Sequence, residues 1–315
     1  MNDRWIQGLE NLPPAARSCV LTIGNFDGVH RGHQAILATA RREADRLGAA
    51  VVAMTFDPSP DLVLRPLDEP RLLTPPARKA ALLLEAGADW AVTAHTTREL
   101  LHASPEQFLQ TIVADGFSPV AMVEGEDFFF GRARGGNVEL LRRFGQEHGF
   151  GVQVVPAVTV TLADASQRIS STLVRELIAD GAVEQAQACL GRCFALSGRV
   201  VAGYGRGRTL DYPTANLDPD RQIVPADGVY AGRAHLDDRE YLAAVSVGNQ
   251  PTFPSGKHAV EAFLLEAEGD FYGLEMNLKF CHRLREQRRF ENVQALKAQM
   301  NEDVQRVRDL LEKRV

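Results

Sequence analysis

The decapeptide GNFDGVHRGH (Gly24–His33) follows a short apolar run and leads into apolar residues at helical spacing. It therefore stands where a strand passes into a helix. The first N–H groups of a helix lack partners within the helix, and the helix dipole adds positive charge there, so anions bind such ends. Gly24 and Gly28 permit a tight turn, and His30 and His33, one helical turn apart, can both donate to phosphate oxygens. The stretch predicts a phosphate-binding turn.

The two histidines also fit three alternatives, which are a metal pair, histidines of the core, and a glycine-rich loop without a ligand. No third His, Cys or carboxylate stands nearby at ligand spacing, which disfavours the metal pair. The other two alternatives stay open from these residues alone.

Around the decapeptide, apolar runs alternate with helical patterns as far as Val155. This alternation is typical of a parallel sheet covered by helices, so we expect a doubly wound α/β domain. The expected strands and helices are Val20–Ile23, Gln34–Leu47, Ala49–Phe56, Trp90–Ala94, Pro105–Ala114, Val120–Val123, Val138–His148 and Gly151–Val155.

From Gly198 onward, short β-branched and aromatic runs are separated by Gly, Pro and Asp, which predicts a small antiparallel β-barrel. The amphipathic pattern of Asn292–Lys313 predicts a helix that caps a core. The expected strands are Gly198–Val201, Gly228–His235, Tyr241–Val247, His258–Leu265 and Glu275–Cys281.

Between the two patterns, Gly181 separates two expected helices, and we place the domain boundary within Val183–Arg192. The predicted domains are 1–185 and 186–315. A chain of 315 residues is long enough for two domains, each with its own core.

The composition disfavours two classes of partner. The formal net charge of -6 argues against a general nucleic-acid binder, which usually presents a basic face. No apolar run reaches the roughly 18 residues that a membrane helix needs. The first 18 residues also lack the basic start and apolar core of a signal peptide. We expect neither nucleic acid nor a membrane as a partner, and the sequence does not predict the oligomeric state.

The four cysteines are Cys19, Cys189, Cys193 and Cys281. They are scattered, and Cys189 and Cys193 have three residues between them rather than the two of a redox or zinc pair. We interpret all four as reduced thiols of a cytoplasmic protein.

The decapeptide resembles the HxGH signature of nucleotidylyltransferases and, as GxFDGxHxGH, the adenylyltransferase half of bifunctional bacterial riboflavin kinase/FAD synthetases. TFDPSP (Thr55–Pro60), EGEDFFFG (Glu124–Gly131) and RISSTLVR (Arg168–Arg175) are similar to the family's TFxPHP, VGxDFxFG and RISSTxIR. The resemblance implies ATP contacts at Gly24, Phe26, Asp27, Gly28, His30, His33, Ser171, Thr172 and Arg175, and flavin contacts at Pro58, Asp127 and Phe128.

These residue types suit those contacts. Ser171 and Thr172 stand at an expected helix start, where hydroxyl and N–H groups can meet a triphosphate, and Arg175 adds a fixed charge. Taken alone they also fit an ordinary helix cap with a surface arginine, and Phe128–Phe130 fit a core. Ser59 stands where the family usually has a histidine, which removes an imidazole from this site.

The stretch GYGRGRTLDYPTANL (Gly203–Leu217) places a flexible basic loop beside a turn at Pro-Thr-Ala-Asn, a combination that suits phosphate. It resembles the riboflavin kinase signature GRGRxLGFPTANL, with Asp211 in place of a glycine. The resemblance implies that Thr214 and Asn216 hold Mg²⁺ with ATP, and oxygen donors suit this hard cation. The ATP-binding residues implied for the kinase are Gly203, Gly205, Arg206, Gly207, Arg208, Thr214 and Asn216.

Glu261 is a carboxylate among the apolar residues of an expected strand. It can simply point to solvent from an alternating strand. The resemblance, which extends from about Ser18 to Leu310, implies that it is the general base for the ribityl 5′-hydroxyl. The same resemblance implies flavin contacts at Arg285 and Gln287, where Gln287 replaces the family's usual glutamate.

The sequence thus predicts a bifunctional enzyme of flavin-cofactor biosynthesis. Its substrates would be riboflavin, FMN and the co-substrate ATP, with Mg²⁺ as cofactor. The first reaction phosphorylates riboflavin to FMN, and the second transfers AMP from ATP to FMN, giving FAD and pyrophosphate. The alternatives are a riboflavin kinase whose adenylyltransferase half is impaired, a nucleotidylyltransferase for another acceptor, and a flavin-binding protein without catalysis.

Overall fold

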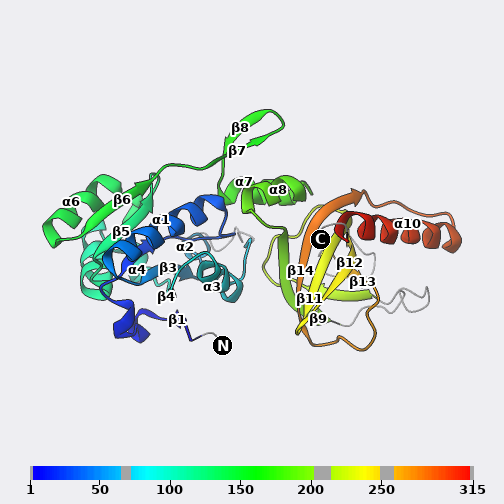
Figure 1. The fold of residues 1–315 in the computed structure, drawn as a ribbon, viewed down its shortest axis with the longest axis horizontal. Coiled ribbons are helices and arrows are strands. Elements are labelled where there is room, and N and C mark those ends of the chain that lie inside the picture. The colour runs from blue at the N-terminus through cyan, green and yellow to red at the C-terminus, as the bar shows by residue number, and fades with distance from the viewer. Residues whose placement is uncertain (1–2, 65–71, 202–213, 249–258, 313–315) are drawn as a thin grey trace. The chain divides into compact units, whose positions relative to one another are not determined.

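A computed structural model describes residues 3–64, 72–201, 214–248 and 259–312 (Figure 1). The chain forms two compact units, one comprising Met1–Pro70 and Pro76–Ser170 and the other comprising Arg71–Pro75 and Ser171–Val315. The boundary expected between residues 185 and 186 falls inside a helix of the second unit, Val183–Leu190, and stays a prediction.

The first unit is built on a six-stranded parallel sheet with the strand order β1-β4-β3-β2-β5-β6. The five expected strands are confirmed, and β1, which the sequence analysis missed, pairs with β4. The strands are β1 (Trp5–Gln7), β2 (Val20–Ile23), β3 (Val51–Asp57), β4 (Trp90–His95), β5 (Ala121–Gly125) and β6 (Gly151–Val155).

Apolar layers cover both faces of this sheet, because side chains that alternate along each strand enter different core clusters. The α1 and α3 helices contribute to one cluster, and α6 and the π-helical segment η3 contribute to the other. The predicted doubly wound architecture is therefore confirmed. The helices are α1 (Arg31–Leu47), α2 (Pro60–Leu64), α3 (Pro76–Glu85), α4 (Arg98–His102), α5 (Pro105–Phe108), η3 (Leu109–Phe117) and α6 (Val138–His148).

Short elements complete this unit. The helix expected over Pro105–Ala114 starts as α5, with a capping box between Ser104 and Gln107, and continues as the wider turns of η3. A two-stranded hairpin before Ser171 was not among the expected elements. The short elements are the 3₁₀ turns η1 (Leu9–Asn11), η2 (Pro14–Ala16) and η4 (Arg132–Arg134) and the strands β7 (Thr159–Leu162) and β8 (Ala165–Arg168).

The second unit is a closed antiparallel barrel with the strand order β10-β13-β12-β11-β14-β9, as expected. Two helices precede the barrel, and the helix α10 packs against its outer face at β11 and β12. The elements are α7 (Ser171–Ala179), α8 (Val183–Leu190), β9 (Phe194–Val201), β10 (Thr214–Asp218), β11 (Gly228–Leu236), β12 (Arg239–Gly248), β13 (Ala259–Leu264), β14 (Glu275–Arg285) and α10 (Val293–Leu311).

The expectation of a turn at Pro-Thr-Ala-Asn is wrong for the residues that the structure describes. Thr214 and Asn216 lie on β10, which pairs with β9 on one side and β13 on the other. Pairing across the barrel, which local composition does not reveal, makes this stretch a strand.

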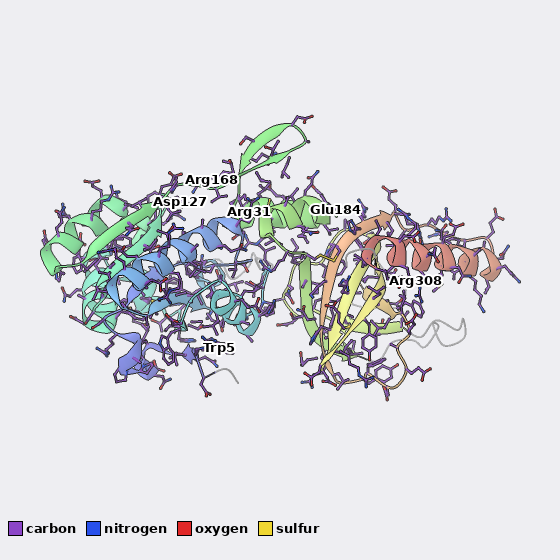
Figure 2. All side chains as sticks on the ribbon, in the orientation of Figure 1. Trp5, Arg31, Asp127, Arg168, Glu184 and Arg308 are labelled. Atoms are coloured by element: carbon purple, nitrogen blue, oxygen red, sulfur yellow. A yellow bond between two sulfur atoms is a disulfide. The ribbon has the colours of Figure 1, made fainter. Side chains whose placement is uncertain are left out.

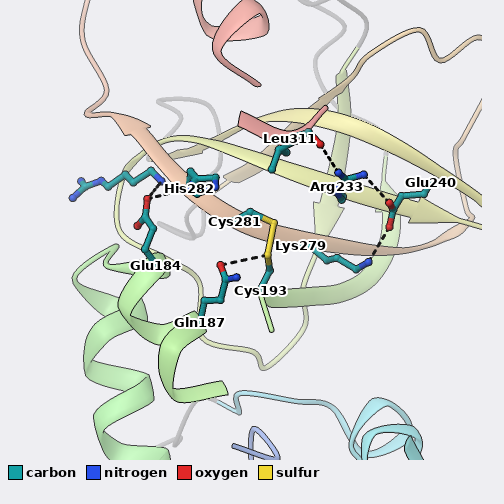
Figure 3. The surroundings of a disulfide bond; sticks show 10 residues. Glu184, Gln187, Cys193, Arg233, Glu240, Lys279, Cys281, His282 and Leu311 are labelled. Atoms are coloured by element: carbon teal, nitrogen blue, oxygen red, sulfur yellow. Dashed lines mark hydrogen bonds and ion pairs between the residues drawn. A yellow bond between two sulfur atoms is a disulfide. The ribbon is translucent and has the colours of Figure 1, made fainter. Parts of the chain in front are cut away.

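The interpretation of all four cysteines as thiols is wrong for Cys193 and Cys281, which form a disulfide (Figure 3). Their separation of 88 residues hid this relation from the sequence. The β9–β14 pairing sets Phe194 opposite Phe280, so Cys193 and Cys281 lie beside each other with Cα atoms 5.1 Å apart. Cys19 and Cys189 are buried thiols, and burial raises the pKa of Cys19 to about 12.

Among the described residues, no helix is long and apolar enough to cross a membrane.

Candidate active sites

The histidine loop, Gly24–His33, begins where β2 ends and enters α1. His30 is the N-cap residue of α1, and its Nδ1 accepts a hydrogen bond of 3.4 Å from the backbone N–H of His33. An Nδ1 that accepts leaves the proton of the neutral imidazole on Nε2. The helix cap therefore sets the tautomer of His30 and makes Nε2–H its donor.

His33 completes the pair. Its ring stacks on His30 with the centroids 3.6 Å apart and forms a T-shaped contact with Phe26, with the centroids 5.1 Å apart. Burial, followed by the charges of His30 and Lys79, lowers the pKa of His33 well below its ordinary value. Its Nδ1 is buried and has no hydrogen-bond partner within the described residues. The structure thus brings the two imidazoles together, and burial favours the neutral form of His33.

The glycines of the histidine loop permit its turn and also leave space for the side chains of Phe26 and His30. Gly28 has φ 83°, and its neighbours Phe26 and Val29 also have left-handed backbone, with φ 46° and 38°. For a β-branched residue such as Val29 this conformation costs about 1–3 kcal/mol. A Cβ on Gly24 would lie 3.3 Å from the Phe26 ring, and one on Gly32 would lie 3.1 Å from the His30 ring.

Buried polar contacts from other elements hold this turn. The carbonyl of Asn25 accepts hydrogen bonds from Thr55 Oγ1 at 3.0 Å and from Lys79 Nζ at 3.1 Å. Just before the loop, the N–H of Ile23 donates to Glu124 Oε1 at 2.8 Å. Burial raises the pKa of Glu124 well above its ordinary value. No role was predicted for Thr55, Lys79 or Glu124, and the signal available for Lys79 and Glu124 was a charge inside an apolar pattern.

Loops that follow adjacent strands share the carboxyl edge of a parallel sheet, where ligands of such folds bind. The histidine loop follows β2, Pro58 follows β3, and Asp127 and Phe128 follow β5, so the sheet order β3-β2-β5 gathers these residues at one edge. Asp127 forms an ion pair of 2.7 Å with Arg168 (Figure 2). Phe128 stacks on Phe130 with the centroids 5.2 Å apart and packs against the core.

The remaining residues implied for adenylyl transfer lie in the second unit. The α7 helix begins at Ser171, as predicted, with Thr172 exposed and Ser171 and Arg175 half-buried. Their joint action with the histidine loop stays a prediction.

In the barrel, strand register places polar side chains in a row across three neighbouring strands. Asn216 on β10 lies opposite Glu261 on β13, which in turn lies opposite Ser246 on β12. Val260 and Ala262 are buried in the barrel, whereas Glu261 between them is half-buried, so the row lies on the outer face. Thr214, two residues from Asn216 on the same strand, shares that face. Glu261 thus stands beside Asn216 in a polar row.

Gln287 and Arg285 both lie near this part of the barrel but have different partners. Gln287 Nε2 donates to Ser246 Oγ at 3.1 Å and to the Val247 carbonyl at 2.8 Å, so Gln287 joins the row. Arg285 forms a bidentate pair with the buried carboxylate of Asp303, with Nη2 2.6 Å from Oδ2. The predicted residues Gly203, Gly205, Arg206, Gly207 and Arg208 and the substituted Asp211 lie outside the described residues.

Comparisons with known proteins assign the two parts of the chain to two different families. Residues 12–173 match the FAD synthetase family, and residues 190–311 match the riboflavin kinase family. A bifunctional riboflavin kinase/FMN adenylyltransferase from Pseudomonas fluorescens is 37% identical over 306 residues, which cover 97% of each chain. This chain belongs to that bifunctional family.

Other members of the bifunctional riboflavin kinase/FMN adenylyltransferase family resemble the chain over similar lengths. The one from Escherichia coli K12 is 35% identical over 95% of each chain, and the one from Listeria monocytogenes is 31% identical over 92% of this chain and 91% of its own. A crystal structure described as a macrolide-efflux protein from Streptococcus pneumoniae has the same fold. It covers 97% of this chain and 99% of its own, with a TM-score of 0.86 and 29% identity.

Proposed function

We propose that the predicted domain 186–315 phosphorylates riboflavin to FMN and that the predicted domain 1–185 adenylylates FMN to FAD. The observation that carries this proposal is the presence in one chain of a stacked histidine pair at a helix N-terminus and of Glu261 in register with Asn216. Membership of the bifunctional family supports both reactions. The intact pair and row also argue against a flavin-binding protein without catalysis, because binding alone needs no general base.

In the adenylyl transfer, a phosphate oxygen of FMN attacks the α-phosphorus of ATP, and the bond from that phosphorus to the bridging oxygen of pyrophosphate breaks. No covalent enzyme intermediate is needed. His30 and His33 would donate N–H groups to the phosphate oxygens on which charge develops. Ser171, Thr172 and Arg175 would hold the triphosphate, and Pro58, Asp127 and Phe128 would contact the flavin.

In the kinase reaction, Glu261 would accept the proton of the riboflavin 5′-hydroxyl as its oxygen attacks the γ-phosphorus, and ADP leaves. Phosphoryl transfer depends mostly on positioning and charge neutralisation, so one base beside a nucleotide site is sufficient. The basic stretch Gly203–Arg208 would bind ATP, and Arg285 and Gln287 would orient the flavin.

The donors present on β10 fit Mg²⁺. Thr214 and Asn216 offer oxygen atoms from one face of the strand, and Mg²⁺ prefers oxygen ligands shared with substrate phosphates. When bound there, the ion would neutralise charge on the transferred phosphoryl group. Within the described residues, no cluster of three or more His, Cys, Asp or Glu side chains offers a metal site made by protein alone.

We also propose that the protein is located in the cytoplasm, where riboflavin, FMN and ATP are available.

Two assays of the purified chain test the proposal. One contains riboflavin, ATP and Mg²⁺, the other contains FMN, ATP and Mg²⁺, and chromatography resolves the flavins. We expect FMN, and then FAD, in the first assay, and FAD in the second. FMN without FAD would leave a riboflavin kinase whose first unit is impaired, as Ser59 could cause, and no product in either assay would exclude both activities.

A further inference from the structure

Lys79 on α3 is a buried cation beside the histidine loop. Only 6% of its surface is exposed, and its helix neighbours Ala80, Leu82 and Leu83 belong to the apolar core. An ammonium in such a place needs polar partners. Its Nζ donates to the carbonyl of Asn25 at 3.1 Å and lies 3.4 Å from the carbonyl of Phe56. Lys79 therefore joins the backbone that follows β2 to the end of β3.

The bond to Asn25 acts at the start of a turn that needs support. The next four residues include Phe26, Gly28 and Val29, all with left-handed backbone, and His30 follows directly. Such conformations persist only where the surroundings determine them. Lys79 and Thr55 both donate to the Asn25 carbonyl, so the turn is held from two other elements.

We propose that Lys79 is a positioning residue for adenylyl transfer, an assignment that rests on the proposed function of the histidine loop. Its ammonium holds the Asn25 carbonyl against the end of β3 and so fixes the turn from which His30 and His33 are presented. The same charge favours the neutral form of the His33 imidazole, and the cap contact of His30 requires its Nδ1 to be unprotonated.

The charges around Lys79 and His33 indicate that Lys79 has two effects, one on the geometry of the turn and one on the pKa of His33. Burial lowers the pKa of Lys79, whereas the carboxylates of Asp27 and Asp57 act to raise it. The pKa of His33 is lowered by burial first and then by His30 and Lys79. Removing the charge of Lys79 should therefore make His33 easier to protonate, and this effect does not depend on the geometry of the turn.

Three variants of the full chain separate these effects. Lys79→Gln removes the charge and weakens the contact to Asn25, whereas Lys79→Arg keeps the charge on a group of different shape. Arg78→Gln is the matched control, because Arg78 precedes Lys79 on α3 but pairs at the surface with Glu85. For each, kcat/KM for FAD formation is measured against pH, with riboflavin phosphorylation and Tm measured on the same preparation.

We expect Lys79→Gln to lower kcat/KM for FAD formation by about 100-fold, the scale of a misplaced catalytic group. In the profile of kcat/KM against pH, the acidic limb of Lys79→Gln should move to higher pH. The acidic limb of Lys79→Arg should stay in place. Riboflavin phosphorylation should be unchanged in every variant, as should FAD formation by Arg78→Gln.

Wild-type values of kcat/KM and an unmoved acidic limb in Lys79→Gln would overturn the assignment. So would a loss of both reactions with a lower Tm, because Lys79 would then serve the fold alone. Absence of FAD formation in the wild-type chain is a separate result, which refutes the proposed function itself.

Discussion

The two candidate sites are built in different ways. The histidine loop is a single decapeptide, in which a helix cap sets the tautomer of His30 and a glycine makes room for its ring. The row in the barrel joins Asn216, Glu261 and Ser246 only through strand register, across residues far apart in the sequence. A locally encoded site can be recognised from its sequence, whereas a site made by register exists only when the barrel is closed.

The strongest test of this comparison separates the two reactions by mutation. We expect His30→Ala with His33→Ala to reduce FAD formation by at least about 10³-fold and to leave FMN formation intact. Glu261→Ala should reduce FMN formation by about 10²–10⁴-fold and leave FAD formation from FMN intact. Chromatography of the flavins measures both rates in each variant. Loss of both activities in either variant would show that the sites are not independent.

Removal of the disulfide tests how far the stability of the barrel unit depends on a contact between residues far apart in the sequence. Cys193–Cys281 closes a separation of 88 residues and ties the start of β9 to β14 (Figure 3). Such a crosslink stabilises mainly by restricting the unfolded chain, typically by about 2–4 kcal/mol. Cys193→Ala with Cys281→Ala should therefore lower the unfolding temperature of the barrel unit and not that of the first unit, as measured by calorimetry.

Dithiothreitol should have the same effect on the wild-type chain and no effect on the double variant, which serves as the control. An unchanged unfolding temperature of the wild-type chain in reductant, or four free thiols by mass spectrometry, would contradict the disulfide.

Gly32→Ala tests the local construction of the histidine loop. The added Cβ would lie 3.1 Å from the His30 ring, so the imidazole must shift by a few tenths of an ångström. We expect FAD formation to fall by about tenfold, because small displacements of catalytic groups are costly. FMN formation should be unaffected. Gly151→Ala in β6 is the matched control, since its Cβ would meet nothing within 4 Å. Equal rates in the two variants would show that Gly32 is not needed for the placement of His30.

The sequence predicted the fold wherever the pattern was local. The apolar periods of β2 and α1, and the alternation that follows them, sufficed for a doubly wound sheet. Contacts between distant residues escaped prediction, because no period marks the partners of Lys79 or Glu124, which bond to Asn25 and Ile23 from 54 and 101 residues away. Pairing across the barrel likewise turned an expected turn into β10 and brought Cys193 beside Cys281.

The smallest expected effect concerns Glu124, a distant residue that supports the local site. Its folded-state pKa is raised by burial, so the folded chain holds a proton that the unfolded chain releases as pH rises. The stability it contributes is complete below the ordinary pKa of a glutamate. As pH rises from there towards the folded-state pKa, the free energy of unfolding declines by about 1.4 kcal/mol for each pH unit. Glu124→Gln keeps an oxygen to accept from the Ile23 N–H and has no such loss.

The Tm of Glu124→Gln relative to wild type should therefore rise between pH 4 and pH 8, as followed by thermal unfolding. Glu106→Gln is the control of opposite sign, because hydrogen bonds from its own backbone N–H and from Ser104 lower the pKa of this exposed carboxylate. Its Tm relative to wild type should stay level or fall over the same range. A Tm difference for Glu124→Gln that does not change with pH would mean that the carboxylate is charged when folded. The loop would then be held by an anion at Ile23 as well as by the cation of Lys79.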